Sequence, residues 1–358
     1  MKKVILSPSK YIQGENEISK LSNYSKIYGD KPLIVFDKYV FDNMKEDILS
    51  SFDENEFLYT CFNGISSKEE INRIIKMYNE NSCNLIIGVG GGSNADTVKA
   101  ATYYLNCSTI IVPTVASTSA SCTNLSVIYN KNGEFEEYLR LKNNPEMVLV
   151  DTAIIAKSPT RFLIAGIGDA LATKFEARAV KKSKKTNHAG GLCSDAAMQL
   201  ASLTYKILID ESERAINAIS NGYATESLDR LIEATIYLSS IGSESGGLAA
   251  AHSIHNGFTK IKQTKEYMHG EIVAFATICQ LVLEGASKEE INEVIDFCKR
   301  ISLPTNLSGI GIKSIKDINW DIVLTTILNK NETIHNMPFN IDSDKLKDSI
   351  LFADKIGS

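Results

Sequence analysis

The stretch Asn84-Leu85-Ile86-Ile87-Gly88-Val89-Gly90-Gly91-Gly92-Ser93 decides the fold, because an apolar run leads directly into consecutive glycines. The apolar residues predict a buried strand, and residues 95–105 predict the helix that follows it. Glycines at such a turn let a phosphate group approach the backbone and the N–H groups at the helix N-terminus. A purely structural turn is the alternative, since Ser93 stands where the usual dinucleotide fingerprint has its third glycine.

Further apolar runs on both sides of this unit predict strands at residues 33–37, 57–62, 109–113 and 147–151. Between two of them, Ser67 and Glu70 have the spacing of a capping box at the start of a helix. Short apolar strands that alternate with helices predict an α/β domain with a mostly parallel sheet.

The strand pattern stops at about Pro159, and long stretches rich in Ala, Leu, Glu, Lys and Ile follow. Residues 168–182, 195–208 and 225–238 are examples, and they predict an all-helical domain. We therefore expect an α/β domain over residues 1–158 and a helical domain over residues 159–358. No linker-like segment separates them, so we expect tight packing and a ligand site between them.

Composition narrows the class of protein. The 358 residues carry a formal charge of −5, which argues against general binding to nucleic acid or anionic membranes. The longest apolar stretch, residues 272–283, is too short to span a bilayer, and the start lacks a signal-peptide pattern. Seven scattered cysteines without a C-x-x-C pair fit reduced thiols, so we expect a cytoplasmic protein.

Three of the five histidines, His252, His255 and His269, fall in one short segment. The spacing of His252 and His255 places both on one helix face. Asp169 stands at the apparent start of the first long helix. Imidazoles with one carboxylate and an open position describe a catalytic zinc site, with bonds of roughly 2.0–2.2 Å. The alternatives are satisfied core histidines and an N-cap role for Asp169.

Two acidic residues have both a cofactor interpretation and a structural one. Asp37 ends a predicted strand, where it could bind an adenosine ribose hydroxyl and favour NAD over NADP, or could serve only as a turn residue. Asp96 and Lys99 lie in the first turns of the helix after the glycines, where a solvated ion pair is the alternative. A hydride carrier beside a Lewis acid indicates alcohol–carbonyl redox chemistry.

In these residues and in further segments, the chain resembles the glycerol dehydrogenases, within the iron-containing alcohol dehydrogenase and dehydroquinate synthase-like superfamily. The resemblance covers nearly the whole length. The segments that carry it are residues 7–14, 62–64, 88–99, 113–118, 125–129, 166–173, 250–257, 269–271 and 333–339.

The resemblance implies an N-terminal Rossmann-like domain with an all-α, dehydroquinate synthase-like C-terminal domain, and NAD and Zn²⁺ (or Fe²⁺) bound between them. It implies that Asp169, His252 and His269 are the metal ligands, with His255 as a catalytic residue that relays protons or supports the ligands. His188 and His335 are read as structural. The positions implied to bind the cofactor are Asp37, Gly90, Gly91, Gly92, Ser93, Asp96, Thr114, Ser117, Thr123, Leu125 and Tyr129.

Three positions depart from the family pattern. Ser93 replaces a lysine beside the phosphates, and Thr123 replaces a serine. Ser119 replaces the aspartate that would contact glycerol, so a charged acceptor for a polyol hydroxyl has become a neutral group. Such a change weakens discrimination between hydroxylated and plain alcohols.

We therefore expect a metal-dependent NAD oxidoreductase that interconverts a small alcohol or polyol and its carbonyl compound. The family also implies a homo-oligomer. One alternative is a dehydroquinate synthase-like cyclase acting on a sugar phosphate, which typically has glutamate where this chain has Asp169. Another is a non-catalytic relative that retains the fold. Net formation of NADH separates the dehydrogenase from the cyclase.

Overall fold

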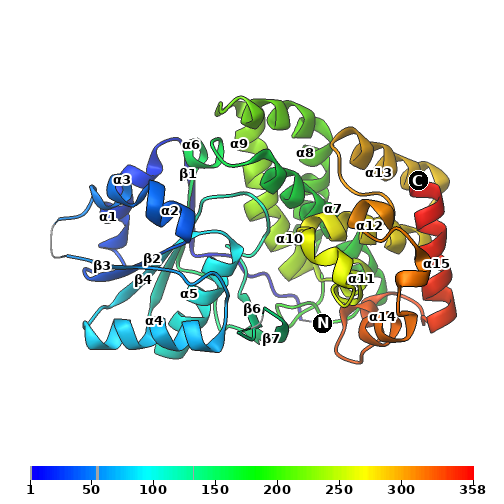
Figure 1. Ribbon diagram of the computed structural model, residues 1–358, viewed down its shortest axis with the longest axis horizontal. Coiled ribbons are helices and arrows are strands. Elements are labelled where there is room, and N and C mark those ends of the chain that lie inside the picture. The colour runs from blue at the N-terminus through cyan, green and yellow to red at the C-terminus, as the bar shows by residue number, and fades with distance from the viewer. Residues whose placement is uncertain (1, 54–55, 132) are drawn as a thin grey trace.

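The computed structural model describes residues 2–53, 56–131 and 133–358. Strands gather on one side of the molecule, and the helices from α7 onward fill the other side (Figure 1). This arrangement confirms the predicted α/β part followed by a helical part.

Six parallel strands form the main sheet in the order β1-β8-β5-β4-β2-β3. Neighbouring residues of β2 point to opposite faces, with Leu33 and Val35 in one core cluster and Ile34 and Phe36 in the other. Both faces are therefore buried, which is why the strands read as continuous apolar runs. The bounds are β1 (Lys10–Gly14), β2 (Pro32–Phe36), β3 (Leu58–Cys61), β4 (Leu85–Gly90), β5 (Ser108–Pro113) and β8 (Met147–Asp151).

Short helices on the α/β part cover the two faces of this sheet. Leu21, Val40 and Ile48 pack on one face, and Ile71, Ile74 and Val98 lie on the other. The bounds are η1 (Glu17–Lys20), α1 (Leu21–Ser25), α2 (Lys38–Asn43), α3 (Lys45–Leu49), α4 (Lys68–Glu80), α5 (Gly92–Leu105) and α6 (Thr152–Ile155).

Only half of the predicted capping box forms at the start of α4. The Ser67 hydroxyl accepts a hydrogen bond from the Glu70 N–H at 3.2 Å, as expected. The Glu70 carboxylate does not reach back to Ser67; it accepts hydrogen bonds from Asn63 and pairs with Arg73 at 2.6 Å. Two better donors therefore displace the reciprocal contact.

A two-stranded antiparallel hairpin, β6 (Leu125–Tyr129) and β7 (Phe135–Arg140), lies apart from the main sheet. It sits beside the boundary between the two parts of the molecule (Figure 1). Neither strand of this hairpin was predicted from the sequence, and the second strand, Phe135–Arg140, is largely exposed and half charged.

The helical part begins at α7, a single helix of 24 residues. The π-helical segment η2 joins α9 to α10 without a break. The bounds are α7 (Thr160–Ser183), α8 (Asp195–Ser220), α9 (Glu226–Ile232), η2 (Glu233–Leu238), α10 (Ser239–Gly246), α11 (Ala250–Phe258), η3 (Lys262–Glu266), α12 (His269–Leu283), α13 (Lys288–Arg300), η4 (Ser308–Ile310), η5 (Ile315–Asp317), α14 (Trp320–Ile327), η6 (Thr333–Asn336) and α15 (Ser343–Gly357).

We propose a domain boundary at residues 158 and 159, between α6 and α7. The first residues of the chain are an exception to this division. The Leu192 N–H donates to the Lys2 carbonyl at 2.9 Å, and the Leu6 N–H donates to the Ser245 hydroxyl at 3.1 Å. The N-terminal segment therefore packs on the helical part before the chain enters the sheet.

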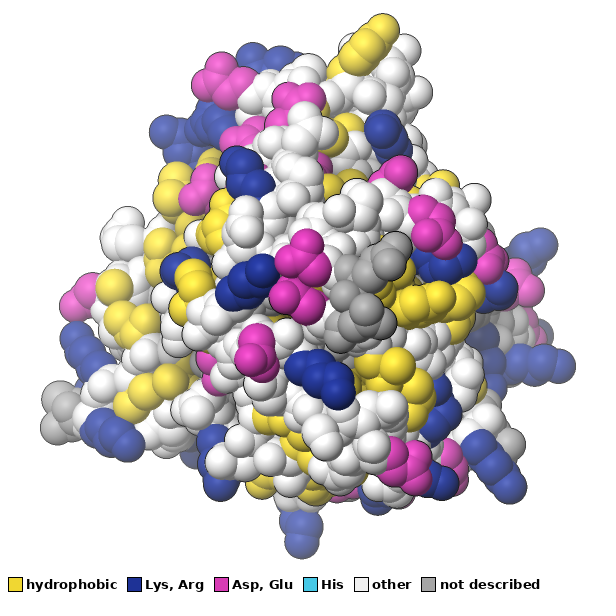
Figure 2. All heavy atoms as spheres, turned by 90° about the vertical axis from the view of Figure 1, so that its left-hand side faces the viewer, with side chains coloured by type: hydrophobic (Ala, Val, Ile, Leu, Met, Phe, Trp, Pro, Cys, Tyr) yellow, Lys and Arg dark blue, Asp and Glu magenta, His cyan; other side chains and the backbone are white. Residues whose placement is uncertain are grey.

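The outer face of the α/β part shows acidic and basic side chains side by side, interspersed with apolar ones (Figure 2). This mixture matches the mild net charge of −5. Among the described residues, no helix combines the length and apolar character that crossing a membrane needs.

Candidate metal and cofactor site

Three helices bring Asp169, His252 and His269 together. Asp169 lies in the middle of α7, so the N-cap interpretation of this residue is wrong. His252 lies on α11, and His269 is the first residue of α12. The Asp169 Oδ1 atom lies 3.4 Å from His252 Nε2 and 3.2 Å from His269 Nε2. Residues separated by 100 positions in the sequence thus face one another.

Two glycines allow this meeting, because α7 and α12 cross where neither helix has a side chain. A Cβ atom on Gly270 would lie 1.7 Å from the Ala165 carbonyl oxygen, and one on Gly168 would lie 2.2 Å from the Gly270 oxygen. Only glycine fits such a close backbone approach. Each glycine is next in sequence to a proposed ligand, so the crossing places Asp169 beside His269.

The spacing of these atoms fits a divalent cation. A tetrahedral site with bonds of about 2.0–2.1 Å separates its ligand atoms by about 3.3–3.4 Å. The two distances to Asp169 Oδ1 match that separation and exceed the roughly 2.7–2.9 Å of a charge-assisted hydrogen bond. All three ligand atoms lie within 4.8 Å of one another. The donor set and its geometry therefore suit a metal such as zinc or iron.

The electrostatics of the cluster favour a charged Asp169. Burial would raise the pKa of this carboxyl, but the facing His269 and His252 hold it well below its usual value. Burial lowers the pKa of His252, but Glu176 and Asp169 together raise it to about 10. Burial, reinforced by the neighbouring histidines, holds the pKa of His255 well below its usual value.

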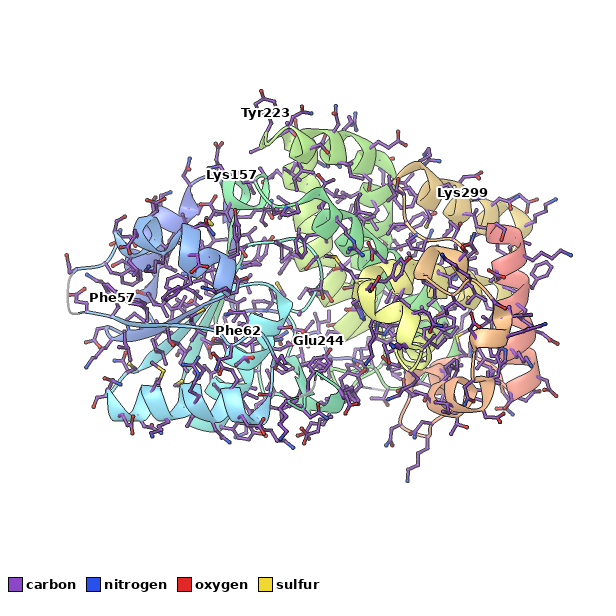
Figure 3. All side chains as sticks on the ribbon, viewed as in Figure 1. Phe57, Phe62, Lys157, Tyr223, Glu244 and Lys299 are labelled. Carbon is purple, nitrogen blue, oxygen red and sulfur yellow. The ribbon has the colours of Figure 1, made fainter. Side chains whose placement is uncertain are left out.

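The loop between β5 and β6 touches this cluster from the α/β side. The Ser119 N–H donates to Asp169 Oδ2 at 3.2 Å, and the Ser119 carbonyl accepts from the Ser240 hydroxyl at 2.7 Å. Glu244, at the boundary in Figure 3, accepts from the Asn124 N–H at 2.8 Å. Helix α10 therefore fixes the loop at two points, Ser119 and Asn124.

Lys99 fixes the same loop from the opposite side. The residue is 1% exposed, and its ammonium group donates to the carbonyls of Ala120 (2.7 Å), Thr123 (3.2 Å) and Leu125. It also pairs with Asp96 Oδ1 at 3.1 Å, while the other Asp96 oxygen accepts from the Val127 N–H. The ion pair is thus present but buried, not solvated, and it organises the loop.

The glycine turn lies where the sequence places it, at the carboxyl end of a central strand. Strand β4 ends at Gly90, and α5 begins at Gly92, earlier than predicted. Asp37 caps α2 through Val40 N–H, and its second oxygen accepts from the Gly91 N–H, both at 3.1 Å. Asp37 is therefore a strand-end cap that also holds the turn in place.

The other proposed cofactor residues lie around the turn. Thr114 follows β5, and its N–H donates to the Gly90 carbonyl at 3.1 Å. Ser93 lies in the first turn of α5, while Ser117 and Thr123 lie in the β5–β6 loop. Leu125 and Tyr129 are the two ends of β6. The turn, the loop and the hairpin are thus adjacent, as a shared binding surface requires.

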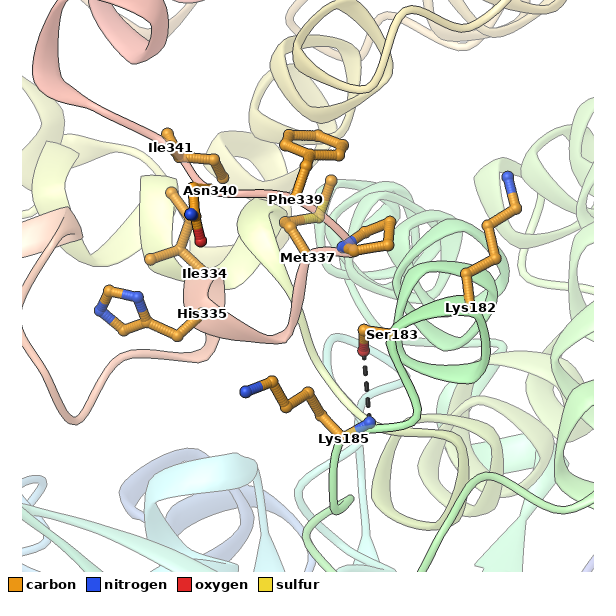
Figure 4. Close-up of a pocket in the computed structure, with 10 residues that line it drawn as sticks. Lys182, Ser183, Lys185, Ile334, His335, Met337, Phe339, Asn340 and Ile341 are labelled. Carbon is orange, nitrogen blue, oxygen red and sulfur yellow. Dashed lines mark hydrogen bonds between the residues drawn. The ribbon is translucent and has the colours of Figure 1, made fainter.

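Two histidines lie outside the cluster, as predicted. The exposed His335 places Nε2 3.1 Å from the Asn329 carbonyl. It lines a cavity of about 560 Å³ between the end of α7 and the segment around η6 (Figure 4). None of the proposed metal ligands lines this cavity. Burial lowers the pKa of His188 to about 4, so this histidine is neutral near pH 7.

Sequence reasoning missed Glu176, which is fully buried on α7. Its Oε2 atom lies 2.7 Å from His252 Nδ1, and its Oε1 accepts from the N–H groups of Ala249 and His252. The available signal was its position seven residues after Asp169, which places both carboxylates on one helix face.

Comparisons with known proteins identify relatives of the chain. Residues 8–152 match the family described as iron-containing alcohol dehydrogenase. A glycerol dehydrogenase from Citrobacter freundii is 44% identical over 100% of this chain and 98% of that protein. A glycolaldehyde reductase from Halobacterium salinarum is 41% identical, with the same coverage of 100% and 98%.

A solved structure agrees over the whole chain. The crystal structure of a probable glycerol dehydrogenase from Sinorhizobium meliloti superposes with a TM-score of 0.94 at 37% identity, covering 99% of each chain. The folds therefore match through both the sheet and the helical part. The chain belongs to the glycerol dehydrogenase family, within the iron-containing alcohol dehydrogenases.

Proposed function

We propose that this oxidoreductase interconverts a small polyol, or a related short alcohol, and its carbonyl compound, using NAD and a zinc ion. The observation that carries the proposal is the Asp169–His252–His269 cluster, which the Ser119 segment touches directly. A dehydrogenase needs its Lewis acid next to the loop that holds cofactor and substrate, and this contact supplies that proximity.

Asp169, His252 and His269 would hold the metal, with an open position toward the β5–β6 loop. A zinc ion bound there would act as a Lewis acid and lower the pKa of an alcohol hydroxyl toward neutral pH. Bound NAD would accept the hydride that leaves the alcohol carbon. A carboxylate with two imidazoles also suits Fe²⁺, so the choice of zinc is part of the proposal.

We assign the cofactor to the glycine turn, the loop and the hairpin. The N–H groups at the start of α5 point toward any pyrophosphate bound at Gly90, Gly91 and Gly92. Asp37 lies beside this turn, where an acidic group disfavours the additional phosphate of NADP. Lys99 keeps the loop carbonyls in place, so the surface for the cofactor exists before binding.

Replacing Ser119 with aspartate should restore preference for polyols. A carboxylate accepts a substrate hydroxyl more strongly than serine does, by about 1.5–3 kcal/mol for a charged hydrogen bond. We expect the ratio of kcat/KM for glycerol to that for 1-propanol to rise about tenfold or more. Ser119→Asn, which adds bulk without charge, is the matched control. An unchanged ratio in Ser119→Asp would remove this position from substrate selection.

The function itself is tested by NADH absorbance with zinc-loaded protein on glycerol, diols and simple alcohols. We expect turnover that a chelator removes and that added zinc restores, because the metal supplies several kcal/mol of stabilisation. Bound NAD without turnover on any of these alcohols, or turnover that survives chelation, would contradict the proposal.

The comparisons give no support to the cyclase alternative, since the relatives reported above are named for dehydrogenase or reductase activity. A homo-oligomer and a cytoplasmic location remain proposals from the family resemblance.

A further inference from the structure

We propose that Glu332, acting through Asn256 and His255, fixes the tautomer of His269 so that its Nε2 atom is free to bind the metal. The four residues form one hydrogen-bonded chain that ends at the proposed ligand set. This inference rests on the proposed metal site and assigns Asn256 and Glu332 as positioning residues for it.

The chain begins at a group that can only accept hydrogen bonds when ionised. The Asn256 Nδ2 atom lies 3.2 Å and 3.1 Å from the two carboxylate oxygens of Glu332. Because a carboxylate accepts, the amide must present its N–H₂ group to Glu332 and its oxygen to the other side. The hydroxyl of Tyr138 donates to that same Oδ1 atom at 3.2 Å, which reinforces this orientation.

The orientation of the amide then determines which ring nitrogens of His255 and His269 carry a proton. Asn256 Oδ1 lies 3.1 Å from His255 Nδ1, so this nitrogen must carry hydrogen and His255 Nε2 must be the acceptor. His255 Nε2 lies 3.0 Å from His269 Nδ1, which must therefore be the donor. A neutral imidazole has one N–H, so the lone pair of His269 is left on Nε2, facing Asp169.

The other histidine is oriented by a shorter route. Glu176 accepts directly from His252 Nδ1 at 2.7 Å, so Nε2 is the nitrogen of His252 that would give up its proton and bind the metal. Both imidazoles are thus connected to a carboxylate on the side away from Asp169. His252 contacts Glu176 directly, whereas His269 reaches Glu332 through His255 and Asn256. Such outer carboxylates set the tautomer and orientation of metal-binding histidines.

Glu332→Gln tests the chain, because glutamine has nearly the same shape but can also donate. The Asn256 amide can then turn over and present N–H₂ to His255, which reverses every donor and places the proton of His269 on Nε2. We expect the Kd for Zn²⁺, measured by competition with a chromogenic chelator, to rise about tenfold. Asn256→Leu removes the amide altogether and should show the same loss.

A second measurement uses the metal-free protein. Nitrogen NMR of histidine-labelled protein distinguishes protonated from unprotonated ring nitrogens, and only five histidines contribute. We expect Nδ1 of His269 to be protonated in the wild type, where it donates to His255, and unprotonated in Glu332→Gln, where the reversed chain makes it the acceptor. Glu266→Gln, at an exposed glutamate of η3, is the matched control and should change neither reading.

Unchanged ring-nitrogen signals and unchanged zinc affinity in both variants would overturn the inference. A general loss of structure is identified separately by a fall in Tm. If wild-type protein bound no zinc, the proposed metal site would fail, but the ring-nitrogen pattern of the metal-free protein would still decide between the tautomers.

Discussion

Replacing His252 with alanine should lower turnover about 10³-fold or more, because a Lewis acid contributes several kcal/mol and each 1.36 kcal/mol is a factor of ten. His252 supplies one of the three facing atoms that we propose as metal ligands. NAD should still bind, since the glycine turn lies on the other part of the molecule, with its Kd raised only by the factor through which zinc and NAD are coupled. Zinc content, NADH formation and NAD titration by fluorescence measure the three quantities.

His335→Ala is the matched control for this variant. His335 is exposed, its ring Nε2 atom contacts the backbone carbonyls of Leu328 and Asn329, and it lies outside the cluster. It should retain zinc and turnover. Wild-type turnover in His252→Ala would exclude this residue from the ligand set, and loss of NAD binding would show that the two sites are not separable.

Gly270→Ala should disrupt the site without altering any ligand. The added Cβ atom would lie 1.7 Å from the Ala165 oxygen and 2.7 Å from its carbonyl carbon, and neither backbone atom can rotate away. Helices α7 and α12 must separate, which moves His269 away from Asp169. We expect a loss of about 1–3 kcal/mol in stability. A displacement on the order of 1 Å can lower turnover about 10²-fold.

Gly14→Ala is the comparison, because its Cβ atom would meet only the flexible side chain of Glu17, at 3.1 Å. Thermal unfolding and zinc content measure the two effects. A Gly270→Ala protein with wild-type Tm and zinc affinity would show that the crossing of α7 and α12 tolerates a side chain at position 270, which would contradict this explanation.

The sequence predicted the elements whose pattern is local. Two predictions depended only on the local sequence: a buried strand formed by the apolar run before Gly88, and an acidic residue, Asp37, at the end of an earlier strand. The structure confirms both. The hairpin strand Phe135–Arg140 was missed because its side chains are exposed, so no apolar periodicity marks it.

Asp169 shows why the rest could not be predicted. Glycine is unfavourable inside a helix, and the helix was expected over residues 168–182, with Asp169 at its start. Tertiary packing outweighs this local preference. A Cβ atom on Gly166 would lie 2.0 Å from the Ala116 carbonyl oxygen, and one on Gly168 would clash with the Gly270 carbonyl, so both positions need glycine. The glycines allow contact between elements that only the folded chain brings together.

The partners of the ligands were hidden for a similar reason. Glu332 precedes a segment that resembles the family, but nothing in its own neighbourhood connects it to His269. Its role depends on two intermediate residues and on the direction in which one amide points. Such information exists only in the three-dimensional arrangement.

The single hydrogen bond from the Ser119 N–H to Asp169 has a thermodynamic consequence. One carboxylate belongs both to the proposed cation site and to the contact between the two parts of the molecule. Whatever draws these parts together stabilises the charged form of Asp169, and a cation that holds Asp169 stabilises the closed contact. Linkage of this kind is reciprocal. Zinc and NAD should therefore lower one another's Kd by the same factor.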